Sequence, residues 1–385
     1  MSKSSVKIVA TADAHLDPKC TRYGSRANAR RADFRKGFLK TVDFAIEKKA
    51  DIFLVAGDLF DGMRPSNGTH AWVMHQFKRL SDAGVNSFVI GGNHDTPRGI
   101  STGVSPLRSH GNSGIIHFFE NPTDIEAIHL KCNGKEVTIV GVGYNPLLQG
   151  DEDPLNIEIP TPSADINILM LHYPIAGFQG FAGEVPLIEV QRIPSGFDLT
   201  IAGHYHAAQQ KRVGTRHIII PGSTERVTFN EEEDEKSFVY IEVDGSKIDI
   251  VQIPVEARPM RTESIEVKPD DQINQVVEEM LKQDLDPSTI LRILVTGVAT
   301  PEGLAAYDRQ FLIRKGDEKV FKTLIEERDL HIKQPEAFEI VGYLDPYEEL
   351  AAYFDSMIEA AESEEKKSLV QEAKTLCLSQ IGGRE

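Results

Sequence analysis

Short apolar runs separated by polar turns dominate the first two-thirds of the chain. They are rich in β-branched residues and show little alternation of apolar and polar positions, which is typical of strands buried on both faces of a sheet. The runs that we interpret as strands are 6–12 (VKIVATA), 52–58 (IFLVAGD), 87–92 (SFVIGG), 136–143 (EVTIVGVG), 166–172 (INILMLH), 199–204 (LTIAGH) and 216–222 (RHIIIPG).

Helical periodicity appears in the two segments that separate the first three of these runs. Apolar residues recur every three or four positions in 33–49 and again in 72–80, which predicts two amphipathic helices. The segments FVYIEVD and KIDIVQIPV, divided by Gly245 and Ser246, read as a hairpin. Strands that alternate with helices in this way predict a layered α/β fold.

The pattern changes after the hairpin, and we divide the chain into three predicted units. Residues 1–258 form the layered α/β domain, and 259–343 form a small α/β module with short helices around the strand LRILVTGV. After Asp345 and Pro346 the segment 344–385 is fully helical, with two stripes of large apolar residues. These stripes predict either a helix pair packed on its own protein or a docking element for a partner helix.

Potential metal ligands stand where five of the predicted strands end. The carboxyl ends of neighbouring parallel strands meet at one edge of a sheet, so these side chains are expected to converge. The residues are Asp13, His15, Asp58, Asn93, His172, His204 and His206.

This mixture of carboxylate, amide and imidazole groups indicates a site for two divalent ions. Imidazole and carboxylate together favour Mn, Fe or Zn over Ca. Two such ions about 3.5–4 Å apart clamp a phosphate, generate a hydroxide nucleophile and stabilise charge on the leaving oxygen. The set therefore predicts hydrolysis of a phosphate ester.

Charge is uneven along the chain. The net charge of −17 argues against wholesale electrostatic capture of nucleic acid. However, residues 19–40 are strongly basic, which indicates either a solvated helix face or a local contact with a phosphate-rich polymer. The candidate DNA contacts are Arg22, Arg26, Arg30 and Arg31 in this stretch and Arg226 outside it, which either meets a phosphate or forms a surface salt bridge.

Other classes of protein are disfavoured by what the sequence lacks. Its apolar stretches are far shorter than the roughly 20 residues of a membrane span, and the N-terminus has no apolar signal core. Cys20, Cys132 and Cys377 are too few and too far apart for a disulfide framework or a zinc ribbon. We therefore expect a cytoplasmic protein with no membrane association.

In their order and spacing these motifs resemble the calcineurin-like metallophosphoesterase superfamily, whose signature is D-x-H, G-D-x-x-D, G-N-H-[DE], H and G-H-x-H. The resemblance implies a four-layer α/β-β/α sandwich. It also implies that Asp13, His15, Asp58 and His206 hold one ion, that Asp58, Asn93, His172 and His204 hold the other, and that Asp58 bridges them. His94 would act on the scissile phosphate or the leaving group, and Asp95 would orient it.

Four segments are similar to one particular branch of this superfamily. PGSTERVTFNEEEDEKSF at 221–238, TADAHLD at 11–17, GDLFD and GGNHD are similar to segments of SbcD-type (Mre-family) DNA double-strand-break repair nucleases. This branch implies a manganese-dependent exonuclease and endonuclease that acts on DNA ends, single strands or hairpins. It also implies a homodimer bound through C-terminal helices to a coiled-coil ABC-type (SMC-like) ATPase, associated with the nucleoid in a prokaryote, and a small domain that faces DNA.

Two other functions stay open from the sequence. One is a different hydrolase on the same scaffold, such as a cyclic-nucleotide phosphodiesterase or a phosphatase. The other is an interaction scaffold without activity, which the complete ligand set argues against. Ala14, Asp17 and Asp61 depart from the branch pattern at positions that flank the predicted ligands, which leaves substrate preference more open than metal binding.

Overall fold

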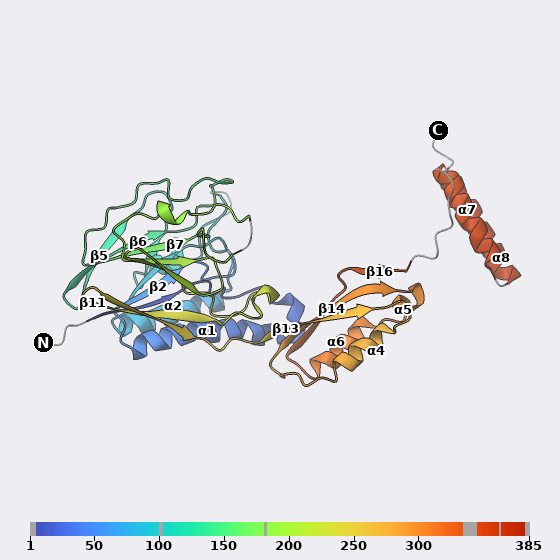
Figure 1. Ribbon diagram of the computed structural model, residues 1–385, viewed down its shortest axis with the longest axis horizontal. Coiled ribbons are helices and arrows are strands. Elements are labelled where there is room, and N and C mark those ends of the chain that lie inside the picture. The colour runs from blue at the N-terminus through green and yellow to red at the C-terminus, as the bar shows by residue number, and fades with distance from the viewer. Residues whose placement is uncertain (1–4, 100–102, 181–182, 334–344, 362, 382–385) are drawn as a thin grey trace.

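The computed structural model describes residues 5–99, 103–180, 183–333, 345–361 and 363–381. Within these residues the chain forms two six-stranded sheets, a smaller third sheet and a C-terminal helix pair (Figure 1). The first two sheets lie face to face, which confirms the predicted sandwich architecture.

The first sheet has the strand order β12-β11-β1-β2-β3-β4. Strands β1 to β4 run parallel, whereas β11 and β12 form the predicted antiparallel hairpin that extends the sheet beyond β1. The strands are β1 (Val6–Thr11), β2 (Ile52–Ala56), β3 (Asn86–Ile90), β4 (His117–Phe119), β11 (Ser237–Asp244) and β12 (Lys247–Pro254).

The second sheet has the strand order β5-β6-β7-β8-β10-β9. Its central strands β6, β7, β8 and β10 run parallel, and antiparallel β5 and β9 form the edges. The strands are β5 (Ala127–Cys132), β6 (Lys135–Val142), β7 (Ile166–His172), β8 (Leu199–Gly203), β9 (Gln209–Val213) and β10 (Arg216–Ile220).

Two helices cover the outer face of the first sheet. Helix α1 (Ala27–Glu47) buries Phe34, Phe38 and Val42 at the spacing that the sequence predicts, and α2 (Asn67–Asp82) packs beside it. The hydroxyl oxygen of Ser66 caps α2 by accepting from the backbone N–H of Thr69 at 3.3 Å. The inner faces of both sheets share a separate apolar core, so the two sheets behave as one unit.

The outer face of the second sheet is covered mainly by connecting segments. Buried apolar side chains from these segments, including Leu155, Ile188 and Phe197, pack on the sheet, and the 3-10 helix η3 (Val190–Arg192) lies among them. The fourth layer of the expected sandwich is therefore made largely of loops. Short helix α3 (Arg108–Gly111) lies instead between β3 and β4.

The third sheet belongs to the segment predicted as a small α/β module. Its order is β13-β14-β15, and β16 also pairs with β14. Its own apolar core includes side chains of α4 and α6. The elements are β13 (Met260–Val267), α4 (Ile273–Met280), β14 (Ile290–Ala299), α5 (Pro301–Ala305), α6 (Arg309–Asp317), β15 (Lys322–Glu326) and β16 (Leu330–Ile332).

Polar and aromatic contacts join the third sheet to the sandwich. The Arg258 guanidinium donates to both oxygens of Asp33 on α1, at 2.6 and 2.8 Å, and lies 3.5 Å from the ring centroid of Phe321. The 3-10 helices η1 (Thr21–Arg26) and η4 (Phe229–Glu231) lie at this junction, where Tyr23, Phe229 and Met260 share a small apolar cluster.

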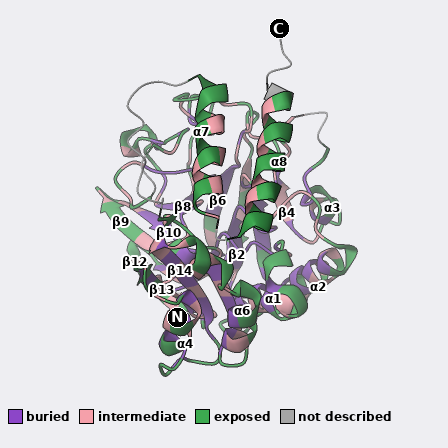
Figure 2. Ribbon diagram, turned by 90° about the vertical axis from the view of Figure 1, so that its right-hand side faces the viewer, coloured by how far each residue is buried: buried purple, intermediate pink, exposed green. Residues whose placement is uncertain are grey.

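Helices α7 (Pro346–Glu359) and α8 (Glu364–Ile381) pack against each other at the C-terminal end of the chain. None of the α7 side chains is buried, and Figure 2 shows both helices largely exposed. The predicted boundary at 343 falls within 334–344, outside the described residues, and the boundary at 258 stays a prediction. No described helix is long and apolar enough to cross a membrane.

Candidate metal centre

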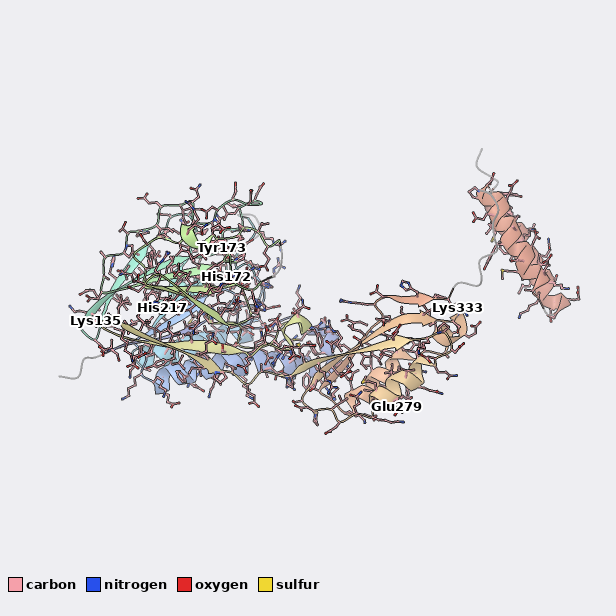
Figure 3. All side chains as sticks on the ribbon, viewed as in Figure 1. Lys135, His172, Tyr173, His217, Glu279 and Lys333 are labelled. Carbon is pink, nitrogen blue, oxygen red and sulfur yellow. The ribbon has the colours of Figure 1, made fainter. Side chains whose placement is uncertain are left out.

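The predicted ligands come from the carboxyl ends of parallel strands in both sheets of the sandwich. Strands β1, β2 and β3 carry the first four residues on the loops that follow them, and β7 and β8 lead to the three histidines. Figure 3 places His172 at the end of β7 inside the sandwich. The structure brings together all of Asp13, His15, Asp58, Asn93, His172, His204 and His206.

One half of the centre is built around His15. Its Nε2 atom lies 3.1 Å from Nε2 of His206 and 3.9 Å from Oδ2 of Asp58. Ligand atoms of Asp13, His15 and His206 all lie within 4.8 Å of one another. This grouping fits the first ligand set that the resemblance implies.

The other half is built around Asn93. Its side-chain oxygen Oδ1 lies 3.2 Å from Nε2 of His172 and 3.1 Å from Nδ1 of His204. The same Nε2 of His172 lies 3.3 Å from Oδ2 of Asp58. Asp58 therefore faces both halves, as a bridging ligand must.

The chemistry of these contacts fits a cation. Nδ1 of His172 lies 2.8 Å from the Ala56 carbonyl, and Nδ1 of His206 lies 3.0 Å from the Glu231 carboxylate, so both nitrogens act as donors. In the neutral imidazoles the opposite nitrogens then carry lone pairs, and these point toward other acceptors. Converging lone pairs repel unless protons or metal ions lie between them, and metal-binding histidines usually donate their second nitrogen in this way.

Backbone conformation is unusual at the ligand positions. Asp13, His15, Asp58 and His204 have positive φ angles of 50°, 43°, 48° and 93°, a region that residues other than glycine rarely occupy. Such conformations store free energy and persist only where the surrounding structure enforces them, which is common at functional sites. The turn at each strand end thus aims the side chain into the centre.

Two glycines allow the close packing of the ligands. A Cβ atom on Gly57 would lie 2.1 Å from Nδ1 of His172, and one on Gly92 would lie 2.1 Å from Oδ1 of Asp58. Both distances are far below van der Waals contact. Only glycine is therefore compatible with this ligand arrangement at these two positions.

The ionisable groups of the centre strongly perturb one another. Burial by itself would lower the pKa of His172, but the Asp58 carboxylate outweighs it and raises this pKa to about 9. Burial would raise the pKa of Asp58, whereas His172 holds it well below its usual range. Burial, helped by His172, lowers the pKa of His204 to about 3. These interactions favour ionised Asp58 and neutral His204, which are the forms that bind metal, whereas His172 is held protonated and would exchange that proton for the ion.

His94 and Asp95 have different surroundings from those expected. The His94 ring is exposed, and its Nδ1 atom lies 2.9 Å from the backbone carbonyl oxygen of Asp61. The Asp95 carboxylate is buried and accepts from the backbone N–H groups of Gly92 at 2.7 Å and Phe60 at 3.2 Å. The Asp61 carbonyl, rather than Asp95, therefore orients the His94 ring, and Asp95 holds the loop that carries it.

Burial raises the pKa of the Asp95 carboxyl to about 7, and the nearby Asp58 charge adds to this increase. A cavity of about 360 Å³ opens beside His94 and gives a ligand access to the centre. Its lining residues are Gly62, Met63, Asn93, His94, Thr96 and Arg98.

The five arginines expected to contact DNA divide into two groups. Arg30 is buried and ion-paired with Glu225, and Arg226 donates to the backbone carbonyls of Glu231 and Asp234. Arg26 donates to the carbonyls of Asp317 and Val320 in the small module. These three side chains hold segments of the chain together, because their donors are already engaged.

Arg22 and Arg31 lie nearer to solvent. Arg22 is exposed and stacks near the rings of Tyr23 and Phe229, at 5.3 and 5.9 Å from their centroids. The Arg31 side chain is about one-third exposed, and its guanidinium lies 3.6 Å from Asp17. These two arginines are better placed to meet a ligand than the other three.

Residues outside the predicted set also support the centre. Glu231 contacts His206, and Oδ1 of Asp61 lies 3.3 Å from Nδ1 of His15. Asp61 stands inside the G-D-x-x-D motif, so its position was a signal for a role at the site. Glu231 is one acid in an acidic run, and composition alone does not distinguish it from its exposed neighbours.

Comparison with known proteins agrees with this geometry. The sequence profile of the calcineurin-like phosphoesterase family matches residues 6–208, which include every predicted ligand. The chain is 23% identical over 332 residues to the DNA double-strand break repair protein Mre11 of Sulfurisphaera tokodaii, covering 85% of this chain and 83% of the relative.

Two further relatives match a smaller part of this chain. The Mre11 protein of Methanopyrus kandleri is 26% identical over 237 residues, covering 60% of this chain and 51% of the relative. The uncharacterized metallophosphoesterase YhaO of Bacillus subtilis is 28% identical over 207 residues, covering 54% of this chain and 49% of the relative. This chain thus spans about half the length of these two relatives.

The fold, the converging ligands and the match over more than half of the sequence lead to one conclusion. The chain belongs to the calcineurin-like phosphoesterase family, and its candidate metal centre lies at the carboxyl ends of strands in both sheets of the sandwich.

Proposed function

We propose that this chain is the manganese-dependent DNA nuclease subunit of a double-strand-break processing complex, with exonuclease and endonuclease activity. The observation that supports this most strongly is the convergence of the ligands in a chain that aligns with an Mre11 protein over the sandwich and beyond it. The relatives' printed role in break repair supports DNA as the substrate rather than a small phosphate ester.

In this proposal Asp13, His15, Asp58 and His206 hold one ion, and Asp58 is shared with a second ion. The remaining ligands of the second ion are Asn93, His172 and His204. Bound divalent ions supply a hydroxide nucleophile and stabilise the charge that develops on the phosphate. The protein's part is to hold ionised carboxylates and neutral imidazoles at fixed positions.

His94 is the proposed proton donor to the leaving oxygen. Because its Nδ1–H donates to the Asp61 carbonyl, its Nε2 is the nitrogen left to face a substrate. The backbone N–H of His94 donates to Oδ1 of Asp58 at 2.8 Å, so the loop position is tied to the bridging ligand. Asp95 keeps this loop in place through its bonds to Gly92 and Phe60.

The proposed units of the protein have separate tasks. Residues 1–258 are the nuclease domain, and 259–343 form a DNA-facing capping domain. Arg22 and Arg31, near the junction of these two units, are the proposed direct contacts to DNA phosphates, whereas Arg26, Arg30 and Arg226 keep the surrounding segments in position.

Residues 344–385 are the proposed docking element for a coiled-coil ABC-type ATPase. The exposed apolar side chains of α7 and α8 support this assignment, because a partner helix would remove them from water. A homodimer that acts on DNA ends at the nucleoid completes the proposal.

The decisive experiment compares two substrates. We expect the purified protein with Mn²⁺ to degrade linear duplex DNA labelled at the 5′ or 3′ end, and the label pattern gives the polarity of digestion. Turnover of a small chromogenic phosphodiester without any DNA cleavage would instead favour a phosphodiesterase or phosphatase function.

A His94→Ala variant tests the proposed proton donor. It should lose DNA cleavage while still binding both Mn²⁺ ions, which isothermal titration calorimetry measures. His75→Ala, an exposed histidine on α2, is the matched control and should retain full activity. Loss of an ion in His94→Ala would show that His94 is a ligand and contradict its proposed role.

A further inference from the structure

The segment that follows β10 contains a buried carboxylate that no metal ligand assignment uses. Glu231 lies in η4 and is only 6% exposed. One carboxylate oxygen, Oε1, accepts from the backbone N–H of Thr228 at 2.9 Å, and the other accepts from Nζ of Lys236 at 2.7 Å. Glu231 is therefore a fixed charge inside the protein.

The same carboxylate also contacts the candidate metal centre. Oε1 of Glu231 lies 3.0 Å from Nδ1 of His206, and this ring nitrogen donates the hydrogen bond. The bond leaves the lone pair of the neutral ring on Nε2, which points at Nε2 of His15, 3.1 Å away. Without Glu231 the His206 ring has no such constraint on its tautomer or rotation.

We propose that Glu231 is a positioning residue that sets the tautomer and orientation of His206 and thereby the metal affinity of the half-site built on His15 and His206. Carboxylates that accept from metal-binding histidines orient the ring and increase its basicity as a ligand. This proposal rests on the metal-dependent activity proposed above. It gives the segment 221–238, which contains Glu231, a role at the centre.

Arg226 fixes Glu231 from the other side. Its Nε donates to the backbone carbonyl of Glu231 at 3.0 Å, and its Nη1 lies 3.3 Å from the carbonyl of Arg258. Because Arg258 directly precedes the small module, one arginine connects the turn that holds His206 to the start of that module.

Two further contacts also connect this turn to the small module. The hydroxyl of Thr262 on β13 donates to the carboxylate of Glu232 at 2.6 Å. Arg292 of β14 lies above the Phe229 ring, 4.4 Å from its centroid. The turn that orients His206 is thus pinned to the third sheet as well as to the sandwich.

The test measures Mn²⁺ binding rather than activity alone. The wild-type protein should bind two ions in calorimetric titrations. In Glu231→Gln, one of the two binding steps should weaken by about 10–100-fold while the other stays unchanged. Glu233→Gln is the matched control, because Glu233 is an exposed residue of the same acidic run, and it should bind both ions normally.

Glu231→Gln leaves Lys236 buried without its main partner, so this variant is paired with Glu231→Gln/Lys236→Met, in which the buried charge is also removed. The same selective weakening is expected in the double variant. Unchanged affinity at both sites in a folded variant would overturn the proposal. Absence of Mn²⁺ binding by the wild type would instead overturn the metal-dependent function itself.

A spectroscopic test measures the His206 tautomer directly in the wild-type protein, and a variant serves only to assign the signal. With Zn²⁺ as a diamagnetic stand-in, ¹⁵N spectra of histidine-labelled protein should show His206 protonated at Nδ1, with its signal assigned by its loss in His206→Gln. Protonation at Nε2, which is incompatible with a bond from Nδ1–H to Glu231, would refute the proposal.

Discussion

The metal centre and the C-terminal helix pair differ in which side chains they expose to solvent. At the centre, polar groups such as Asp13, Asp58 and His172 are buried, and other polar side chains of this chain contact them. In the helix pair, apolar groups lie in water: Tyr353, Leu369 and Leu376 are 60%, 66% and 67% exposed. The centre is built from residues of this chain, whereas the helix pair leaves large apolar side chains in contact with water.

The difference also separates two uses of apolar residues. In the sandwich, apolar side chains lie between the sheets and keep the strand ends in register, so they determine where the ligands meet. In α7 and α8, similar side chains contribute little to the chain's own stability, because burial rather than apolar character provides the free energy. Four changes in sequence or pH test this contrast.

Asp58→Asn should have the largest effect. The substitution keeps the shape of the side chain but removes the charge that both half-sites share, so phosphodiester hydrolysis should fall by about 10⁴-fold, or ~5 kcal/mol in activation free energy. Steady-state assays with saturating Mn²⁺ measure the loss. Asp82→Asn, at an exposed ion pair on α2, is the control. A loss smaller than tenfold would contradict the bridging role of Asp58.

Leu54→Ala should destabilise the protein by about 2–5 kcal/mol, because Leu54 is fully buried between the sheets and its removal leaves a cavity. Urea unfolding followed by tryptophan fluorescence and circular dichroism measures the change in unfolding free energy. A change below about 1 kcal/mol would mean that the inner core is not closely packed.

Acid should destabilise the sandwich through His110. This side chain is buried against His70, and burial, with a smaller contribution from His70, lowers the pKa of His110 to about 4. A lowered pKa means that the fold favours the neutral ring. The stabilisation is therefore present above about pH 6.5 and is lost as the pH falls through 4, by up to about 3 kcal/mol.

His110→Gln sharpens this test. The variant should lose less unfolding free energy between pH 7.5 and pH 4 than the wild-type protein, since it has no ring to protonate. The comparison cancels the contribution of the other titrating groups, which are the same in both proteins. Identical pH profiles would show that His110 does not contribute to acid sensitivity.

Leu369→Ala should have the smallest effect, within about 0.5 kcal/mol, although it removes the same atoms as Leu54→Ala. The pair of variants thus compares one substitution at a buried and an exposed position. Destabilisation equal to that of Leu54→Ala would show that α8 packs on its own chain and would remove the contrast between the two regions.

The sequence predicted the layered α/β architecture and the convergence of the candidate ligands for one physical reason. Apolar runs buried on both faces are easy to detect, and the ends of strands meet at an edge of a sheet, so Asp13, Asp58 and His172 were expected to lie close together, as they do. Contacts between distant residues were harder to predict. Arg30 was expected to contact DNA because it lies in a basic stretch. In the structure its side chain instead pairs with Glu225, which is almost two hundred residues away in the sequence.

The same limit explains the roles assigned around His94. The family resemblance implied Asp95 as its partner, but the backbone turns the Asp95 carboxylate toward Gly92 and Phe60. The Asp61 carbonyl takes that place, and a backbone atom leaves no signature in residue type. The loop layer over the second sheet was equally hidden, because irregular segments lack periodicity.

Gly57 and Gly92 affect how the activity of related proteins can be inferred from their sequences. A single methyl group at either position would occupy the space of His172 or Asp58. A relative that retains every coordinating residue but has alanine at one of these glycines would therefore be inactive, although a count of its ligands would classify it as a working hydrolase. Loss of catalysis in evolution then needs no change in any residue that touches a metal.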